Sequence, residues 1–484
     1  MNREFFINIT FLIAINLLIK PFYIFGIDRV VQNLVGKETY GLYFALFNFT
    51  YLLQIINDFG IQNYNNRNIA QHNQLLDKYF PNILVLKFFL GLAYLLVVIT
   101  VAYGLGYEVQ YYHLIWMIAI NQMLVSLLFY LRSNISGLAM YRTDSIISAL
   151  DKLLMILICG YLLWWSPWRE NFQIEWFIYA QTTSLALSTL VAFFIVGKRL
   201  KRFKLRFNPV FLKLILKESY PYALVIFLMT LYTRIDAVMI ERLLSDGKAE
   251  AGIYASAFRL LDAVNMIGFL FAGLLLPMFS KMLKNKEPLN ALLRFSLGLI
   301  WTGAIAFSIT THFFRNEIMA LLYDEATLYW GSVLGYLIMT FIAVSGTYIY
   351  GTLLTAGARL MKMNLIFVVG IILNIVLNYW LILELKAVGA AIATVITQFF
   401  VLFAQILLAL KIFDLKWDFP LIFRVLLFAT GVGLLAYWAH DFWSFDWKIS
   451  YVLCGLLSII FSLICGLIQP KVIVEFWLGK SEKG

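Results

Sequence analysis

Charged side chains are scarce in this chain of 484 residues: Asp, Glu, Lys and Arg make up 13% of it, while hydrophobic residues make up 62%. Ordinary soluble domains carry about 25% charged residues, so the composition excludes a soluble globular protein. The net charge of +11 does not indicate nucleic-acid binding, because the basic residues stand in short loops between apolar runs and form no solvated face. We therefore expect a polytopic membrane protein.

Cysteine and histidine are also scarce. The three cysteines, Cys159, Cys454 and Cys465, lie inside apolar runs without a CxxC spacing, and the four histidines are scattered. This pattern predicts no disulfide framework, no metal site and no cofactor. Long outer loops are lacking as well, since the longest one, about 312–327, is too short for a catalytic domain. The protein is therefore expected to work within the membrane and not to be an enzyme.

Long apolar runs are what the chain has in abundance. Crossing about 30 Å of hydrocarbon takes roughly 20 helical residues, and charge-free runs of this length recur along the whole sequence. The first run follows MNR without a small-x-small cleavage site, so we expect a retained helix and not a signal peptide. The runs predict an all-α protein with fourteen spans, near 5–26, 40–63, 79–103, 112–131, 145–165, 175–197, 219–240, 251–280, 291–311, 328–350, 363–383, 387–410, 421–439 and 449–469.

The distribution of Lys and Arg predicts the orientation. With the N-terminus inside, most basic residues fall in inner segments, including KRLKRFKLR at 198–206. The positive-inside rule then places both termini in the cytoplasm. The basic loop is mainly a topology signal, and it can also rest on anionic lipid headgroups.

A short motif occurs twice. GKETYGLYFALFN from Gly36 reads against GKAEAGIYASAFR from Gly247 with a constant offset of 211 residues, although Ala45 and Ala255 match only after a slip of one residue. The offset relates spans 1 to 6 to spans 7 to 12 in the same topology. Parallel repeats of this kind build transporters with a substrate site between the two halves. Among the residues that match without a slip are Lys37, Gly41 and Tyr43 with Lys248, Gly252 and Tyr254.

Three stretches give the chain a resemblance to a known family: residues 35–70, residues 232–265 with YTRIDAVMIERLL, and VGAAIATVITQ at 388–398. They resemble the polysaccharide flippases of the O-antigen and capsule type, within the multidrug, oligosaccharidyl-lipid and polysaccharide exporter superfamily. The resemblance implies a MATE-like bundle with two pseudo-symmetric six-helix lobes around a central cavity, plus two C-terminal helices. The expected parts are 1–205 with spans 1 to 6, 206–412 with spans 7 to 12, and 413–484 with spans 13 and 14 and a cytoplasmic tail.

The resemblance also implies a function. Such proteins move polyprenyl-pyrophosphate-linked oligosaccharides from the cytoplasmic to the outer leaflet by alternating access, for cell-surface polysaccharide biosynthesis. The expected location is the bacterial inner membrane. The expected partners are the lipid-linked glycan, membrane lipids and other polysaccharide-assembly proteins, with no nucleic acid.

Cations within the spans are the candidate substrate-binding residues. An ionised side chain at mid-bilayer costs about 2.5 to 3.5 kcal/mol on insertion scales, so such residues face a wet cavity or a partner. Fixed positive charge would also carry a pyrophosphate, and Arg offers forked donors that match phosphate oxygens. By their spacing from the outer surface, the first three candidates share a depth of roughly 10 to 14 Å, and the other two form a lower tier. They are Lys20, Arg234, Arg259, Lys87 and Lys152.

Four acids accompany these cations: Asp58, Asp151, Asp236 and Asp262 are candidates for gating or for coupling to a proton or sodium gradient, which stays open. Arg234 and Asp236 are separated by about 200° on an ideal helix, so one of them is expected to face a neighbouring helix. Asp262 follows Arg259 at i,i+3 and can pair with it, as a brace between helices or beside substrate. Asp151 can simply neutralise Lys152.

Other function classes compete with this interpretation. A multidrug exporter or a peptidoglycan-precursor flippase would share the fold, but five cations against four acids favour an anionic substrate over the organic cations of drug exporters. A glycosyltransferase or polymerase that uses a polyprenyl donor would need clustered carboxylates in an outer loop. Asp28 and Glu38 stand ten residues apart in such a loop, which is poor support for acid-base chemistry.

Overall fold

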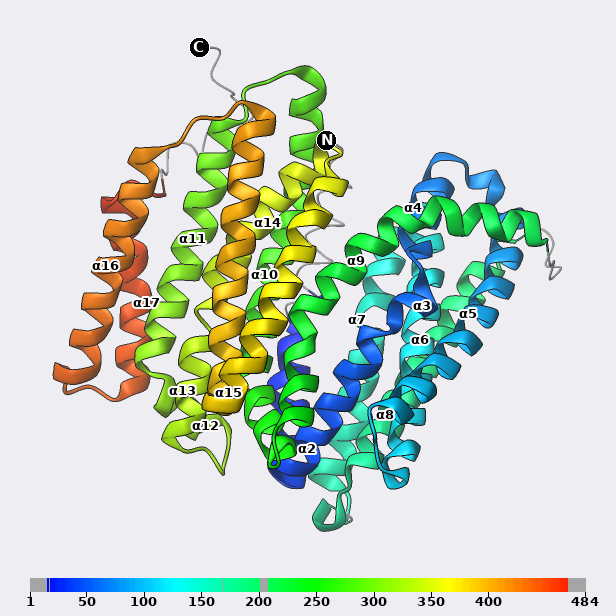
Figure 1. Cartoon of the computed structure of the whole chain (residues 1–484), viewed down its shortest axis with the longest axis horizontal. Coiled ribbons are helices and arrows are strands. Elements are labelled where there is room, and N and C mark those ends of the chain that lie inside the picture. The colour runs from blue at the N-terminus through cyan, green and yellow to red at the C-terminus, as the bar shows by residue number, and fades with distance from the viewer. Residues whose placement is uncertain (1–14, 17, 168, 201–207, 469–484) are drawn as a thin grey trace. The chain divides into compact units, whose positions relative to one another are not determined.

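The computed structural model describes residues 15–16, 18–167, 169–200 and 208–468 (Figure 1). Half of the predicted span 5–26 (residues 5–14 and 17), most of the basic loop 198–206 and the tail beyond 468 lie outside the described residues. Within them every regular element is a helix. The longer helices are α2 (Arg29–Leu52), α4 (Ile61–Gln71), α5 (Leu76–Gly104), α6 (Tyr112–Gly137), α7 (Tyr141–Gly160), α8 (Ile174–Gly197), α9 (Pro209–Leu243), α10 (Gly247–Asn285), α11 (Asn290–Phe313), α13 (Leu328–Leu337), α14 (Thr340–Ala356), α15 (Leu360–Phe413), α16 (Phe419–Phe442) and α17 (Trp447–Ile464).

Eleven of the described helices are long and apolar enough to cross a membrane, or up to twelve if the bent pair Leu18–Leu52 and Gln54–Gln71 forms one span. This confirms the all-α membrane class that the apolar runs predict. The count of fourteen stays a prediction.

Breaks inside two continuous helices explain part of the difference in count. The 54 residues of α15 would extend about 80 Å at 1.5 Å per residue, far more than one crossing of about 30 Å needs. The backbone leaves the helical region at Lys386 (φ 54°, ψ −130°), between the predicted spans 363–383 and 387–410. In α2 the same happens at Gly36 (φ 78°, ψ 164°), between the first two predicted spans.

A second break divides the helix that follows Gly36. α2 ends at Leu52, the short helix α3 (Gln54–Asp58) follows, and two left-handed residues, Phe59 (φ 49°) and Gly60 (φ 73°), precede α4. Together these pieces bend by 44°. A Cβ atom on Gly60 would lie 2.7 Å from backbone atoms of α9, so both the left-handed conformation and the close approach require glycine.

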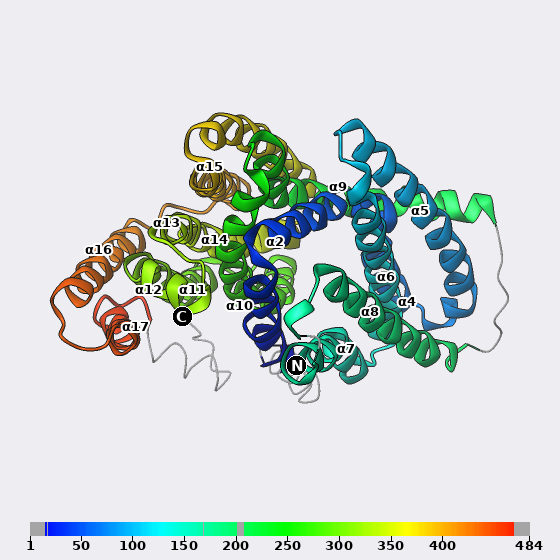
Figure 2. The same cartoon turned by 90° about the horizontal axis from the view of Figure 1, so that it is seen from below.

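The chain divides by contact into two units, Met1–Ala255 and Ser256–Gly484. The predicted parts 1–205, 206–412 and 413–484 stay predictions, since an internal repeat is tested by superposition and not by contact. In the first unit α6 packs against α4, α5, α7 and α8 (Figure 2). Their apolar faces share one core that includes the fully buried rings of Phe80 and Tyr130, which stack 5.8 Å apart.

In the second unit α11 packs against α14, α16 and α17. Polar groups on α11 join it to its neighbours: the Trp301 indole donates to the Ile342 carbonyl (3.2 Å), and the Thr311 and Tyr451 hydroxyls lie 2.9 Å apart. At one end of α11 Phe314 contacts both His440 and Tyr451. The two C-terminal helices α16 and α17 thus dock on α11 through packed rings and hydrogen bonds.

The two copies of the repeated motif contact one another within the first unit. A Cβ on Gly41 would lie 1.9 Å from the Lys248 carbonyl oxygen, and a Cβ on Gly252 would lie 2.0 Å from the Lys37 carbonyl oxygen. The contact is reciprocal, because Gly41 and Gly252 are equivalent in the repeat and so are Lys37 and Lys248. The Gln32 amide also donates to the Gly252 carbonyl (2.9 Å). The glycines are therefore required so that α2 and the first turns of α10 can touch backbone to backbone.

Candidate functional site

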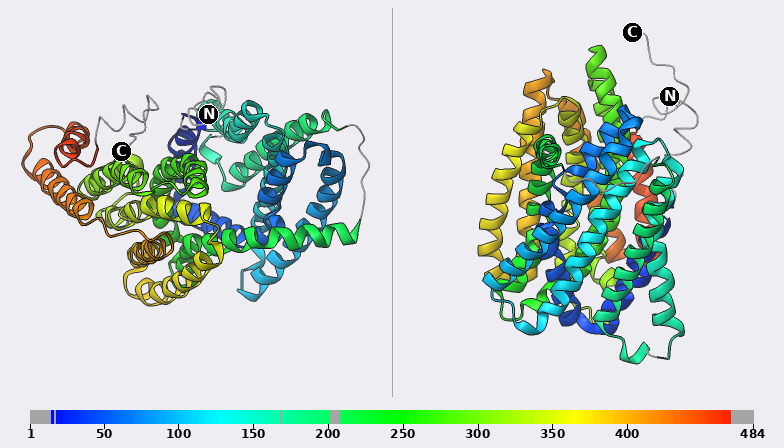
Figure 3. Two further views of the ribbon diagram at one scale, coloured as in Figure 1. Left: turned by 90° about the horizontal axis from the view of Figure 1, so that it is seen from above. Right: turned by 90° about the vertical axis from the view of Figure 1, so that its right-hand side faces the viewer.

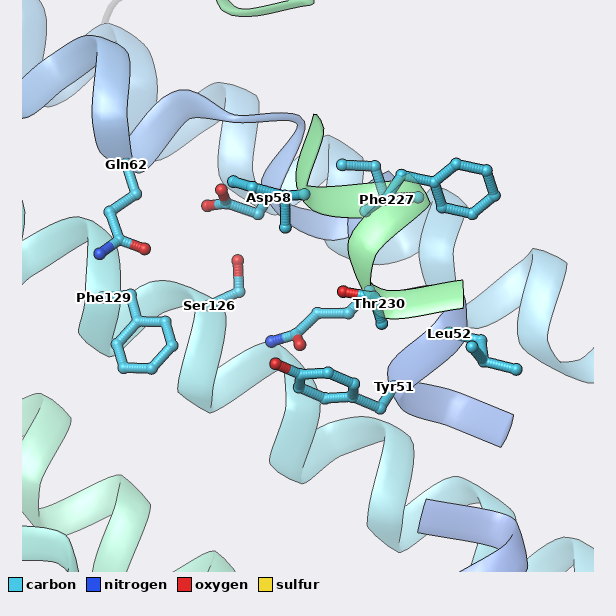
Figure 4. Close-up of a pocket in the computed structure, with 11 residues that line it drawn as sticks. Tyr51, Leu52, Asp58, Gln62, Ser126, Phe129, Phe227 and Thr230 are labelled. Carbon is cyan, nitrogen blue, oxygen red and sulfur yellow. The ribbon is translucent and has the colours of Figure 1, made fainter. Parts of the chain in front are cut away.

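A small cavity of about 90 Å³ lies in the first unit beside the break in the second predicted span (Figure 4). Figure 4 shows the Asp58 and Ser126 side chains pointing toward one another, with Tyr51 and Thr230 on one side. The cavity has room for only a few water molecules. Its lining comes from α2, α3, α4, α6 and α9, with the residues Tyr51, Leu52, Gln54, Ile55, Asp58, Gln62, Ser126, Phe129, Ile226, Phe227 and Thr230.

Lys87 lies beside this cavity and is buried against the helix break. Its ammonium donates to the Asp58 carboxylate (2.5 Å), the Ser126 hydroxyl (2.6 Å) and the Asn57 carbonyl (3.3 Å). Since α3 ends here, the Asn57 carbonyl lacks a partner within a continuous helix, and the Lys87 ammonium supplies one. The Lys87 side chain is only 4% exposed, so this geometry favours a bracing role over direct substrate contact.

Asp58 has two different surroundings. One carboxylate oxygen binds Lys87, while the side chain remains 18% exposed and lines the cavity. A carboxylate that is both paired and accessible can exchange its partner for a proton or a cation when the cavity changes. Asp58 accordingly remains a candidate for gating or coupling.

Arg234 and Asp236, the charged pair in the apolar sequence YTRIDAVMI, point in different directions. The Asp236 side chain is fully buried and accepts a hydrogen bond from the Tyr254 hydroxyl (2.8 Å) on α10. The Arg234 guanidinium lies 5.7 Å from the ring centre of Tyr51, which lines the cavity. The expectation that one of the two faces a neighbouring helix is confirmed, and the residue that does so is Asp236.

Aromatic rings continue from Tyr51 along one face of α2. Tyr51 stacks on Phe47 with ring centres 6.1 Å apart and planes within 12°, and Phe47 in turn contacts Tyr43 (6.2 Å). Tyr43 is fully buried against Phe177, whereas Phe47 and Tyr51 are half-buried. The accessible part of the series is therefore the stacked pair Phe47 and Tyr51, with Arg234 over the second ring.

Lys20, Lys152 and Asp151 gather elsewhere in the first unit. The Lys152 ammonium lies 3.2 Å from the Asp151 carboxylate and 4.7 Å from the ring centre of Tyr23. Lys20 lies within electrostatic range of both Asp151 and Lys152. The proximity of Asp151 and Lys152 agrees with mutual neutralisation. Sequence spacing assigns Lys20 and Lys152 to separate depths, whereas the structure brings both to Asp151.

Arg259 and Asp262 belong to the second unit. Their side chains lie 3.9 Å apart at i,i+3 and are 15% and 25% exposed, so the expected pairing on one helix face is confirmed. Because Arg234 and Lys20 belong to the first unit, the tier of three cations that the sequence suggests stays a prediction.

A cluster at the end of α9 was not singled out from the sequence. Glu241, whose side chain is only 1% exposed, pairs with the Arg242 guanidinium and accepts from the Tyr107 hydroxyl (3.2 Å). Burial raises the pKa of the Tyr107 phenol and the Glu241 carboxylate raises it further, so Tyr107 stays protonated and donates. Arg242 covers the Tyr107 ring at 3.9 Å. The only sequence signal was a pair of opposite charges where the apolar run ends.

Tyr107 belongs to the loop between α5 and α6, and a second tyrosine of this loop, Tyr111, also contacts the region where α9 ends and α10 begins. The Lys248 ammonium donates to the Tyr111 hydroxyl (2.6 Å) and lies 4.5 Å from the centre of its ring. These contacts lie at the end of the first unit where the glycines of the repeated motif meet. In the part of the chain that the structure describes, no three His, Cys, Asp or Glu side chains gather as metal ligands.

A family model described as "Polysaccharide biosynthesis protein" matches residues 6–283. No curated protein sequence matches the chain at a significant level. The family match confirms the resemblance that the sequence suggested.

The fold is similar to those of several solved transporters. The lipid II flippase MurJ in an inward closed conformation matches with a TM-score of 0.70 at 16% identity, covering 96% of this chain and 98% of that one. An inward-facing multidrug resistance MATE family transporter of the MOP superfamily gives 0.62 at 13% identity, with 80% and 93% covered. A MOP superfamily transporter from Pyrococcus furiosus gives 0.58 at 12% identity, with 84% and 94% covered. These similarities confirm the predicted MATE-like fold.

Proposed function

The family match covers more than half of the 484 residues, so the chain belongs to the polysaccharide biosynthesis protein family, and we propose that it is a flippase for a polyprenyl-pyrophosphate-linked oligosaccharide. It would carry this lipid from the cytoplasmic to the outer leaflet of the bacterial inner membrane by alternating access, with both termini in the cytoplasm. No bond of the substrate is made or broken in this process, so the protein is not an enzyme. Its partners would be the lipid-linked glycan, membrane lipids and other proteins of polysaccharide assembly.

The position of Arg234 is the observation that carries the proposal. The guanidinium is half-buried within the apolar span Tyr222–Leu243 and lies over Tyr51 at the cavity. A guanidinium can bind two phosphate oxygens at once, and it holds its charge at any physiological pH. The stacked rings of Phe47 and Tyr51 offer flat apolar faces beside it. A cation next to aromatic faces suits a substrate in which a pyrophosphate is joined to sugars.

Two cations lie beside the cavity wall, Lys87 and Arg234. Lys87 and Asp58 form an ion pair and cancel one another, while Asp236 is turned toward Tyr254. An exporter of organic cations would instead need an unpaired carboxylate in its cavity. The pairing of Asp58 therefore supports an anionic substrate over a multidrug role.

A peptidoglycan-precursor flippase is the second candidate, because the lipid II flippase has a similar fold along nearly the whole chain. Both substrates would present a pyrophosphate to Arg234 and differ in their sugars. Restored growth of cells depleted of their own lipid II flippase would favour this candidate. Failure to restore growth, together with loss of surface glycan in a deletion strain, would favour the oligosaccharide.

Substitution of Arg234 tests the proposal directly. We expect Arg234→Ala to abolish glycan export, and Arg234→Lys to impair it because Lys keeps the charge but loses the forked donor. Surface glycan is measured at matched protein levels, with Arg199→Ala, an exposed arginine outside the spans, as the control that should export normally. Normal export by Arg234→Ala would refute this role for the residue.

A further inference from the structure

A second pocket, of about 330 Å³, lies in the first unit between α4 and the part of α9 that precedes its membrane span. α9 begins at Pro209, but its apolar span begins only at Tyr222. Figures 1 and 3 show this first part of α9 lying across the ends of other helices of the unit, beside α4. Lys213 and Lys217 are exposed on it. The pocket is therefore placed at a water-facing end of the unit and not among acyl chains.

The lining is rich in groups that hydrogen-bond in pairs. A side-chain amide can donate to one hydroxyl and accept from another, an ionised carboxylate can accept from two hydroxyls, and tyrosine rings offer flat apolar faces. The volume falls within the range of about 300 to 1,000 Å³ that is typical of small-molecule sites. The lining residues are Tyr64, Arg67, Asn68 and Gln71 on α4, and Leu214, Glu218 and Tyr222 on α9.

The charges in this pocket balance. Arg67 supplies one positive charge and Glu218 one negative charge, and within the described residues no ion pair joins them: the Arg67 guanidinium donates to the Tyr222 hydroxyl (3.3 Å). Arg67, Gln71 and Glu218 are all exposed. A pyrophosphate would meet the Glu218 carboxylate at close range, which is unfavourable. A neutral polyhydroxylated ring would instead find donors and acceptors on both walls.

The α4 wall is held in place before any ligand binds. The Asn68 amide donates to the Tyr64 carbonyl (2.9 Å), and Tyr64 and Tyr79 pack against the same apolar core. Tyr79 in turn packs edge-on against Phe211 of α9, with ring centres 5.0 Å apart. A pre-positioned wall reduces the ordering that binding requires.

One helix links this pocket to the cavity. On α9, Tyr222 lines the pocket and Ile226 lines the cavity, and residues four apart lie on the same face of a helix, about 6 Å apart along its axis. A lipid-linked glycan with its pyrophosphate near the cavity could thus extend its sugars toward the pocket.

We propose that the pocket formed by α4 and the first part of α9 is a sugar-recognition site that binds a neutral sugar residue of the glycan. This rests on the proposed flippase function, and it adds a specificity site separate from the charged group that engages the pyrophosphate. The pocket lies at a water-facing end of the first unit, and it selects the glycan by the pattern of hydroxyl groups on its sugar.

Binding of free oligosaccharide to the full-length protein in detergent tests this inference. The probe is the repeat-unit oligosaccharide released by mild acid from the surface polysaccharide of the source cells, and titration calorimetry gives the Kd. We expect Gln71→Ala and Glu218→Ala each to raise the Kd about fivefold or more, the effect of losing a hydrogen bond to a ligand. Gln74→Ala is the matched control, since Gln74 is equally exposed but does not line the pocket. Its Kd should stay at the wild-type value.

Two further arms separate this site from the cavity. Inorganic pyrophosphate should not compete with the oligosaccharide, and Arg234→Ala should bind the oligosaccharide normally while failing in export. Competition by pyrophosphate, or an unchanged Kd in both pocket variants, would overturn the sugar site. Normal export by Arg234→Ala with intact oligosaccharide binding would instead refute the Arg234 role and leave the sugar site standing.

Discussion

At the scale of residues, the ion pair of Lys87 and Asp58 illustrates how a membrane helix can be broken without exposing its backbone. The break after α3 leaves a carbonyl and a carboxylate close together, and one ammonium satisfies both. Removing one partner of a buried ion pair typically costs about 3 to 5 kcal/mol, because the other charge is left uncompensated. The pair should therefore matter more for stability than for substrate binding.

Lys87→Met tests this interpretation. We expect a clearly lower thermal midpoint of the purified protein in detergent, followed by intrinsic tryptophan fluorescence. The double variant Lys87→Met with Asp58→Asn should recover part of the loss, since it removes the unpaired charge as well. Lys78→Met, which changes an exposed lysine on the same helix, serves as the control. A single variant as stable as the wild type would show that the pair does not brace the break.

At the scale of elements, the backbone contact between α2 and the first turns of α10 depends on two glycines. A methyl group at either position would collide with a carbonyl oxygen, and backbone cannot move aside as a flexible side chain can. α2 and α10 would then have to move apart, and this movement would disturb the neighbouring contacts of Glu241, Arg242 and Lys248.

We expect Gly41→Ala and Gly252→Ala each to lower the thermal midpoint and to reduce glycan export. The thermal midpoint of the double variant should fall by less than the sum of the two single decreases, because the first methyl group already separates the same two segments. Gly197→Ala, where a Cβ would meet nothing within 4 Å, should behave like the wild type. Full additivity would indicate that the two glycines act at independent contacts.

At the scale of the whole molecule, orientation rests on the basic loop at 198–206 and on the loop between α9 and α10. The first is rich in Lys and Arg and the second holds one Asp and no Lys or Arg, so the positive-inside rule places them on opposite sides. Reporter fusions at Lys201 and Asp246 should therefore report cytoplasmic and outer locations, respectively. Reports from the same side for both would contradict the predicted topology.

The sequence predicts the parts of this fold that depend on local composition. Apolar runs predict the long helices, and the 200° separation correctly predicts that Arg234 and Asp236 face different surroundings. The partners of Lys87 could not be predicted, because Asp58 and Ser126 lie on other helices 29 and 39 residues away. Nor does the composition of α15 reveal that its backbone breaks at Lys386, a residue type without special preference for that conformation.

The sugar-recognition site escaped prediction for a similar reason. Its lining residues lie in two segments that are far apart in the sequence, one on α4 and one on the first part of α9. Only the packing of α4 against α9 brings Arg67, Gln71 and Glu218 around one pocket.

The reciprocal glycine contact also bears on the history of the chain. Two separate copies of a half-length protein could form the same contact as a homodimer, since each copy supplies both the glycine and the carbonyl that the other needs. In a fused chain the two copies would be free to diverge at equivalent positions: 211 residues separate Asn48, buried and bonded to its own helix, from Arg259. Duplication and fusion would thus allow one half to acquire a charge that a symmetric dimer would have to carry twice.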